Sequence, residues 1–124
     1  MLHDVAKDIP DVSFVLPHFG AGYPTELLHL CWTSPNIFVD TSGSNQWIRW
    51  MAYKLTLEDL FRKFYETIGP ERIIFATDSS WFPRMYAYSY LEEQHRIMRF
   101  LRFSRKEIKM ILSGNARKLL KLDL

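Results

Sequence analysis

Three short apolar runs along the chain predict β-strands. Each run is rich in β-branched or aromatic residues and follows a turn signal, and the runs span Val12–Leu16, Ile37–Val39 and Ile73–Ala76. They are continuous and do not alternate with polar residues, which is typical of strands covered on both faces in a parallel sheet. We therefore expect a parallel sheet of three strands.

Helical patterns lie before, between and after these strands. Each combines apolar positions at helical spacing with a start or stop signal, such as Pro in the first turn or a capping box. The first three expected helices are Leu2–Ile9, one that opens at Pro24, and one that is capped by Thr56 and Asp59 and stopped by Gly69 and Pro70. Two more are expected over Tyr90–Phe103 and after a capping box of Ser104 and Glu107. Gly114 is expected to break the second of these, and Asn115 to cap a last helix that runs through Leu120. Strands that alternate with helices in this way indicate βα units and not hairpins. We expect three such units in one α/β domain.

The composition narrows the class of protein. Hydrophobic residues make up 48% and aromatic residues 15% of the 124 residues, which predicts a packed globular chain the size of one domain. The net charge is +2, and the mildly basic stretch from Arg99 to Lys121 alternates with apolar residues at helical spacing. This pattern indicates a solvated helix face, so we expect no nucleic-acid partner.

Cysteine usage and the absence of targeting signals in the sequence point to a reducing compartment. The single cysteine, Cys31, excludes an internal disulfide and a cysteine-based zinc cluster, and we expect it to be a small buried hydrophobic residue. The sequence has no run of 18 apolar residues and does not begin with a signal-peptide pattern. We therefore expect a cytoplasmic protein without a membrane partner.

A polar residue suited to chemistry follows each expected strand: His18, Asp40 and Asp78. In parallel α/β sheets the carboxyl ends of the strands share one edge, and active sites open there. Taken singly, the two aspartates are typical of turn formers or helix caps, and the histidine of a hydrogen-bonded residue where a strand meets a loop. The joint occurrence favours a site at this edge.

Four segments of the chain resemble, in order, the C-terminal part of the amidohydrolase-2 family, which includes metal-dependent hydrolases and decarboxylases related to the aminocarboxymuconate-semialdehyde and γ-resorcylate decarboxylases. The segments are Leu-Pro-His-Phe-Gly-Ala-Gly at 16–22, Asn-Ile-Phe-Val-Asp-Thr-Ser-Gly at 36–43, Gly-Pro-Glu-Arg-Ile-Ile-Phe-Ala-Thr-Asp at 69–78, and Gly-Asn-Ala-Arg-Lys-Leu-Leu at 114–120. The resemblance implies a partial (β/α)₈ TIM barrel comprising strands six to eight and the C-terminal helices. Residues 1–124 would then form a single C-terminal fragment of such a barrel.

The resemblance also implies roles for individual residues. Asp78 corresponds to the aspartate that binds a divalent metal, Zn²⁺ or Mn²⁺, and helps to handle the proton of its bound water. His18 corresponds to the histidine beside that water, a general acid/base or electrostatic stabiliser. Bound Zn²⁺ lowers the pKa of water from 15.7 to about 7, and imidazole and carboxylate suit the resulting hydroxide.

Residues near these two receive weaker assignments. Asp40 and Ser42 are expected to shape the loop and face the pocket. Trp81 and Arg84, shortly after Asp78, are expected to line the mouth through which a small-molecule substrate enters. Aromatic packing within the last loop is the alternative explanation for that segment.

The chain departs from the family at the metal ligands of the earlier strands. The resemblance implies a His-x-His pair on the first strand and another histidine on the fifth, but the histidines here are His3, His18, His29 and His95. His29 and His95 are expected at the surface of helices or partly buried there. A complete barrel needs roughly 200 residues or more, so 124 residues supply about three of its eight strands. The open edges and apolar inner face predict self-association or pairing with the missing N-terminal half.

Three hypotheses remain at this point. The first is one part of a metal-dependent hydrolase or non-oxidative decarboxylase that is inactive without its N-terminal half and holds the metal only when the site is complete. The second is a non-catalytic remnant, a folded interaction domain that kept the barrel pattern. The third is a small doubly wound nucleotide-binding domain, which Gly20-Ala21-Gly22 supports poorly because the third glycine of G-x-G-x-x-G is missing.

Overall fold

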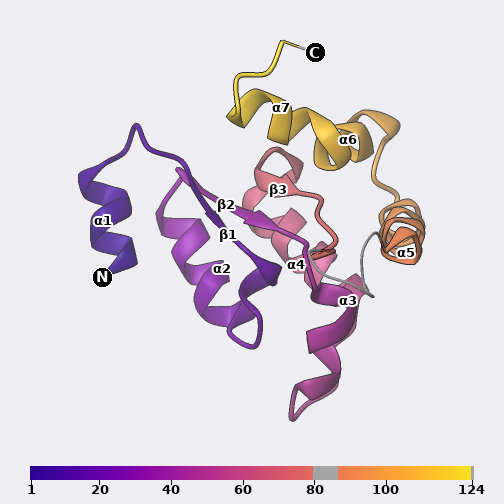
Figure 1. Ribbon diagram of the computed structural model, residues 1–124. Coiled ribbons are helices and arrows are strands. Elements are labelled where there is room, and N and C mark those ends of the chain that lie inside the picture. The colour runs from indigo at the N-terminus through magenta and orange to yellow at the C-terminus, as the bar shows by residue number, and fades with distance from the viewer. Residues whose placement is uncertain (80–86, 124) are drawn as a thin grey trace.

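The computed structural model describes residues 1–79 and 87–123. In chain order the elements are α1 (Leu2–Asp8), β1 (Phe14–Leu16), η1 (His18–Gly20), α2 (Pro24–Thr33), β2 (Ile37–Asp40), α3 (Ser44–Trp47), η2 (Ile48–Trp50), α4 (Leu57–Ile68), η3 (Pro70–Arg72), β3 (Ile73–Ile74), α5 (Tyr88–Phe100), α6 (Arg105–Lys109), η4 (Met110–Gly114) and α7 (Asn115–Leu119) (Figure 1). Elements η1 to η3 are short 3₁₀-helices, and η4 is a π-helical turn between α6 and α7.

The three strands form a parallel sheet in the order β1-β2-β3, as the sequence predicted. Ile37, Val39 and Ile73 are fully buried on the covered face of the sheet. On β1, by contrast, Val15 is 40% exposed. Since neighbouring residues of a strand point to opposite faces, the second face of β1 is not covered by the described part of the chain.

The core lies between the sheet and the helices that follow its strands. Helices α2 and α4 pack against each other (Figure 1). Phe19 of η1 is fully buried, and its ring centroid lies 5.3 Å from that of Phe61 and 4.8 Å from that of Phe64, both on α4. Aromatic pairs at this spacing add to the free energy gained from burial. The residue after His18 is thus anchored in the core.

Both expected capping boxes are confirmed. The Thr56 hydroxyl accepts a hydrogen bond from the Asp59 backbone N–H at the start of α4, and the Asp59 carboxylate accepts one from the Thr56 backbone N–H. Ser104 and Glu107 repeat this arrangement at α6. The Tyr65 hydroxyl also donates to Glu107, at 2.7 Å, and this contact lowers the pKa of the Glu107 carboxyl. The caps therefore fix where α4 and α6 begin.

The expected break at Gly114 is wrong. Gly114 has helical backbone angles, φ −60° and ψ −43°, and the helix continues through it into α7. Asn115 is also helical and does not cap α7. Its amide instead donates to the backbone carbonyls of Pro70, at 2.7 Å, and Ile73, at 2.8 Å. A long-range contact to the start of β3 therefore takes the place of the expected local cap.

Other boundaries differ from the expectations for similar reasons. Strand β3 ends at Ile74, because the next donor toward β2, the backbone N–H of Ala76, binds the Thr41 hydroxyl at 3.1 Å instead of a backbone carbonyl. The expected helix over Tyr90–Phe103 is α5, Tyr88–Phe100. Helix α3 and the 3₁₀ turn after it were not expected. Among the described residues, no helix is long and apolar enough to cross a bilayer.

Cys31 is fully buried, as expected, and burial raises the pKa of its thiol to about 11. The guanidinium of Arg72 donates to the backbone carbonyls of Cys31, Ser34 and Ile37, at 3.0, 3.0 and 3.1 Å. Carbonyls at a helix end have no partner within the helix. Arg72 therefore joins the end of α2 and the start of β2 to the segment that enters β3.

Candidate active site

His18 is held at the carboxyl end of β1 by an unusual backbone. Its φ is +63° and that of Phe19 is +45°, in the left-handed region that side chains other than glycine rarely adopt. Burial of Phe19 keeps the chain in this conformation. Such strain is concentrated at functional sites, where the surrounding structure maintains it.

The carboxylate of Asp40, at the end of β2, binds the loop that carries His18. One oxygen, Oδ1, accepts hydrogen bonds from the backbone N–H of His18 at 3.1 Å, from the backbone N–H of Ser42 at 2.9 Å, and from the Ser42 hydroxyl. Two strand ends are therefore joined through one carboxylate oxygen.

The imidazole of His18 contacts Ser42 directly. Its Nδ1 atom lies 2.7 Å from the Ser42 backbone carbonyl oxygen and 2.8 Å from the Ser42 hydroxyl oxygen. Ser42 is buried, whereas His18 and Asp40 are partly buried. Within the described part of the chain, the other ring nitrogen, Nε2, has no hydrogen-bond partner.

Gly43 lies between His18 and Asp78. A Cβ atom placed on Gly43 would be 3.2 Å from Asp78 Oδ2, 3.2 Å from His18 Nδ1 and 3.6 Å from His18 Cε1. Gly43 also has φ +61°, which a side chain would strain. The polar groups expected after the three strands thus gather around Ser42 and Gly43. We call His18, Asp40, Ser42, Gly43 and Asp78 the strand-end cluster.

Thr41 links the cluster to the segment that leads to Asp78. Its hydroxyl accepts from the Ala76 backbone N–H at 3.1 Å and donates to the Ala76 carbonyl at 3.2 Å, and its own backbone N–H donates to Ile74 at 2.9 Å. The Gln94 side chain of α5 donates to the Thr41 carbonyl at 3.4 Å and to Asn45 at 2.8 Å. These contacts keep the ends of β2 and β3 in register.

The strand-end cluster does not contain a complete metal site. Among residues 1–79 and 87–123, no group of three or more His, Cys, Asp or Glu side chains is arranged to hold a metal ion. Asp78 offers one donor at this edge, with His18 beside it, and Zn²⁺ takes four ligands in typical protein sites. Any metal bound here requires further donors.

The remaining predicted residues fall elsewhere. Trp81 and Arg84 lie outside the described residues. His29 is exposed on α2, and His95 is partly buried on α5, as expected. Ser42 and Gly43 matter more than the sequence suggested. The signal for them was the run Asp-Thr-Ser-Gly at 40–43, directly after a strand.

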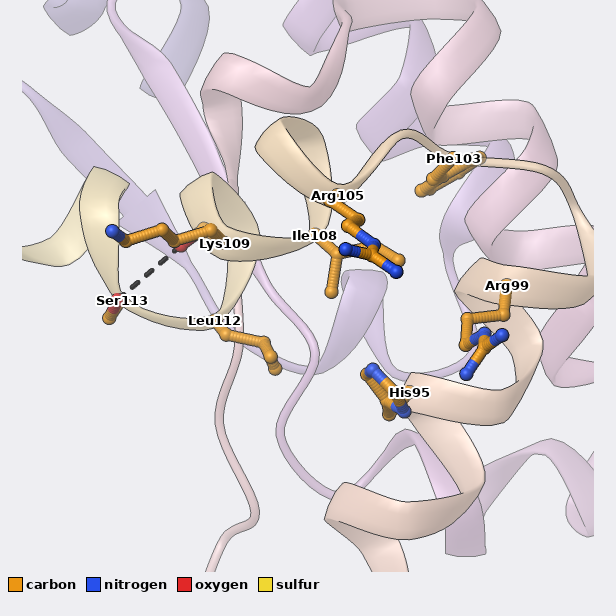
Figure 2. A pocket seen from close by; sticks show the side chains of 8 residues that line it. All are labelled: His95, Arg99, Phe103, Arg105, Ile108, Lys109, Leu112 and Ser113. Atoms are coloured by element: carbon orange, nitrogen blue, oxygen red, sulfur yellow. Dashed lines mark hydrogen bonds between the residues drawn. The ribbon is translucent and has the colours of Figure 1, made fainter.

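A second region is a cleft of about 560 Å³ between α5 and the α6–η4 segment. Its apolar floor includes Phe103 and Ile108, which are mostly buried. Figure 2 shows the side chains of His95, Arg99 and Arg105 around the same space. We call it the cationic cleft. None of these three side chains forms an ion pair with a described residue.

The family follows from the sequence as a whole. The amidohydrolase family profile matches residues 1–122. The chain belongs to the amidohydrolase family. This confirms the resemblance carried by the four segments. No curated protein matches the chain.

Solved structures of other proteins share the fold of this chain. An amidohydrolase from Burkholderia multivorans superposes with a TM-score of 0.73 at 17% identity over 98% of this chain and 48% of its own, and a second crystal form of that protein contains zinc. An uncharacterized TIM-barrel protein from Bordetella bronchiseptica gives 0.67 at 23% identity, over 97% and 38%. A dihydroxybenzoic acid decarboxylase from Polaromonas sp. JS666, with bound manganese and an inhibitor, gives 0.64 at 18% identity, over 95% and 36%.

This amidohydrolase chain spans about half of the length of the Burkholderia protein and less of the other two. Its three parallel strands and their helices are part of a TIM barrel, as the sequence predicted. The expected position of the site, at the carboxyl edge of the strands, is where such barrels carry their active sites.

Proposed function

We propose that this chain supplies the His18 and Asp78 side of the active site of a metal-dependent hydrolase or non-oxidative decarboxylase acting on a small molecule. The observation that carries the proposal is the convergence at Gly43, where His18 Nδ1 and Asp78 Oδ2 both approach one point within 3.2 Å. His18 and Asp40 come from the carboxyl ends of β1 and β2, and Asp78 comes from the segment that follows β3; catalytic groups of TIM barrels lie at this edge.

The two side chains have different roles in this proposal. Asp78 contributes a carboxylate oxygen to a divalent metal, Zn²⁺ or Mn²⁺, whose other ligands come from barrel strands outside this chain. His18 holds or moves a proton through its Nε2 atom, because Nδ1 is occupied by Ser42. The metal, when bound, acts as a Lewis acid and generates a nucleophile from water at neutral pH.

The preorganised loop favours a catalytic over a purely structural explanation. Left-handed backbone angles at His18, Phe19 and Asp78 cost free energy of order 1–3 kcal/mol each. A barrel kept only for its fold has no need to hold two strand-end residues in this conformation. The strain is understandable if the side chains must be aimed at a common ligand.

The proposal is tested with Mn²⁺, a paramagnetic probe that broadens NMR signals of nearby nuclei, on the chain assembled with a half-barrel that supplies the further metal ligands. We expect Mn²⁺ to broaden the signals of His18, Gly43 and Asp78 before those of other residues, and Asp78→Asn to abolish this selectivity. His18→Ala is expected to keep the selectivity for Gly43 and Asp78, because His18 is not a metal ligand in this proposal. Asp11→Asn, an exposed carboxylate outside the cluster, is the matched control and changes nothing.

Assembly with a partner half extends the test to activity. Strands one to five can be supplied as a half-barrel from the Burkholderia multivorans relative. We expect bound metal to depend on Asp78, and turnover of lactone or carboxylated aromatic substrates to fall about 10²- to 10⁴-fold in His18→Ala with metal retained. Uniform Mn²⁺ broadening that Asp78→Asn does not alter contradicts the proposal and favours a non-catalytic remnant.

A further inference from the structure

We infer that Asp40 and Ser42 are positioning residues that hold His18 in one tautomer, with the proton on Nδ1 and the lone pair on Nε2. This inference rests on the proposed function for its purpose, since a fixed tautomer matters only if His18 transfers or holds a proton. Its structural content depends on the contacts among these three residues alone.

The first step is an account of the proton on Nδ1. The Ser42 backbone carbonyl, 2.7 Å from Nδ1, can only accept a hydrogen bond. A neutral imidazole carries its proton on one nitrogen and a lone pair on the other. If the lone pair were on Nδ1, two acceptors would face each other at 2.7 Å. The contact is favourable only when Nδ1 carries the proton.

The second step is an account of the Ser42 hydroxyl. Its oxygen lies 2.8 Å from His18 Nδ1 and also contacts Asp40 Oδ1. An ionised carboxylate only accepts, so the hydroxyl proton points to Asp40 and the hydroxyl lone pairs face Nδ1. This direction again requires a proton on Nδ1. Both contacts of Nδ1 therefore select the same tautomer.

The third step explains why Asp40, which does not touch the imidazole in any of these contacts, still controls it. Oδ1 of Asp40 binds the backbone N–H of His18 and the backbone N–H of Ser42, so it fixes both partners of the imidazole contact. Hydrogen bonds to a charged acceptor are stronger than those between neutral groups. Removing the carboxylate frees the Ser42 loop to turn its carbonyl away from Nδ1.

The consequence for the site is a defined basic nitrogen. With Nδ1 protonated and bound to Ser42, Nε2 of neutral His18 is the atom that can accept a proton. A hydrogen bond at one ring nitrogen commonly sets the role of the other in catalytic and metal-binding histidines. Asp40 thus acts through Ser42 and the loop, and its effect is visible as a tautomer.

The experiment is an NMR measurement of two-bond ¹⁵N–¹H couplings in the imidazoles of the full chain, at a pH at which His18 is neutral. These couplings separate the Nδ1–H form from the Nε2–H form. His29, exposed on α2, is an internal reference for an unrestrained imidazole in the same spectrum. We expect His18 to give the Nδ1–H form alone, and His29 to give an average of the two forms.

Substitutions then test the positioning role. In Asp40→Ala we expect His18 to shift to an average like that of His29, and in Asp40→Asn to shift part of the way, because an amide oxygen accepts more weakly. Ser42→Ala keeps the Nδ1–H form, since the backbone carbonyl remains. Asp11→Ala is the matched control and leaves His18 unchanged. The dispersion of the amide spectrum reports whether each variant is folded.

In the unsubstituted chain, an Nε2–H form or an unrestrained average for His18 overturns the inference. In a folded Asp40 variant, an unchanged Nδ1–H form of His18 overturns it as well. If Asp40→Ala does not fold, Asp40→Asn decides. The measurement uses neither metal nor substrate. A fixed Nδ1–H form without selective Mn²⁺ binding therefore rejects the proposed function alone, and selective Mn²⁺ binding with a mobile imidazole rejects the positioning role alone.

Discussion

In the strand-end cluster, the contacts of His18, Asp40 and Ser42 pair donors with acceptors, whereas in the cationic cleft His95, Arg99 and Arg105 gather without an ion-pair partner among the described residues (Figure 2). The cluster is partly or fully buried and strained, but the two arginines of the cleft are exposed to water. Solvent screens the charges of these exposed arginines. A cavity of about 560 Å³ is therefore a weaker indicator of chemistry here than a set of short, mutually dependent contacts.

The difference concerns coupling between residues. In the cluster, one carboxylate oxygen serves two backbone groups and a hydroxyl, so a change at one position reaches several others. In the cleft, His95, Arg99 and Arg105 share no such contact within the described part of the chain. Substitutions in the cluster should therefore have large effects that depend on one another, and substitutions in the cleft should have small effects.

The largest effect is expected for Gly43→Ala. The added Cβ would lie 3.2 Å from both His18 Nδ1 and Asp78 Oδ2, and φ +61° strains any side chain. We expect a loss of about 2 kcal/mol in the free energy of unfolding, measured with urea, and loss of selective Mn²⁺ broadening. In an assembled barrel, activity should fall about 100-fold, because small displacements of catalytic groups are costly.

Gly22→Ala is the matched control for this change. Gly22 also has positive φ, +97°, but an added Cβ would have no atom within 4 Å. It reports the cost of backbone strain without the contact to His18 and Asp78. If both variants lose stability equally and Gly43→Ala keeps selective Mn²⁺ broadening, the contact of the added Cβ with His18 and Asp78 has no effect. The strand-end cluster is then not tightly packed around Gly43.

The second effect is that of Thr41→Val, a change of nearly constant shape. It removes the hydroxyl of Thr41, which is fully buried, and so leaves the backbone N–H and carbonyl of Ala76 without that hydrogen-bond partner. We expect a loss of about 1–3 kcal/mol by urea unfolding, and weaker Mn²⁺ selectivity because Asp78 lies two residues beyond Ala76. Thr33→Val removes hydroxyl contacts at an exposed helix position and should cost less than about 0.5 kcal/mol. Similar losses of stability in the two variants would contradict the importance given to the hydrogen bonds between Thr41 and Ala76.

Local patterns in the sequence were sufficient for much of the architecture. The caps at Thr56 and Ser104 depend on residues only three positions apart, so they were predictable. The order of strands and helices gave the edge where His18 and Asp78 meet, because all parallel strands end on the same side. The family profile over residues 1–122 confirms the resemblance that the four segments carried.

Contacts between distant residues were not predictable in the same way. Asn115 fits the local signal for a helix cap, but the carbonyls of Pro70 and Ile73 bind its amide from 45 and 42 residues away. Gly114 remains helical within the run from η4 into α7, and both of these elements pack against β3. No rule of residue spacing in the sequence predicts that Gly43 lies between His18 and Asp78. This arrangement depends on how the ends of three strands are placed in space.

The smallest effect is expected in the cationic cleft, for Arg99→Ala and Arg105→Ala. Each should change the free energy of unfolding by no more than about 0.5 kcal/mol, with a slight gain at low salt as repulsion between cations is relieved. The gain should disappear near physiological ionic strength, where the screening length is about 8 Å. Urea unfolding at two salt concentrations measures both.

Arg72→Met is the control substitution for this prediction. It removes a guanidinium that serves three backbone carbonyls, and it should cost about 1.5–3 kcal/mol with little dependence on salt. The contrast between Arg72 and the two cleft arginines separates an arginine that holds the fold from arginines that only line a surface. A loss above about 1 kcal/mol in either cleft variant would show that the cleft is coupled to the core, and the division between the two regions would then fail.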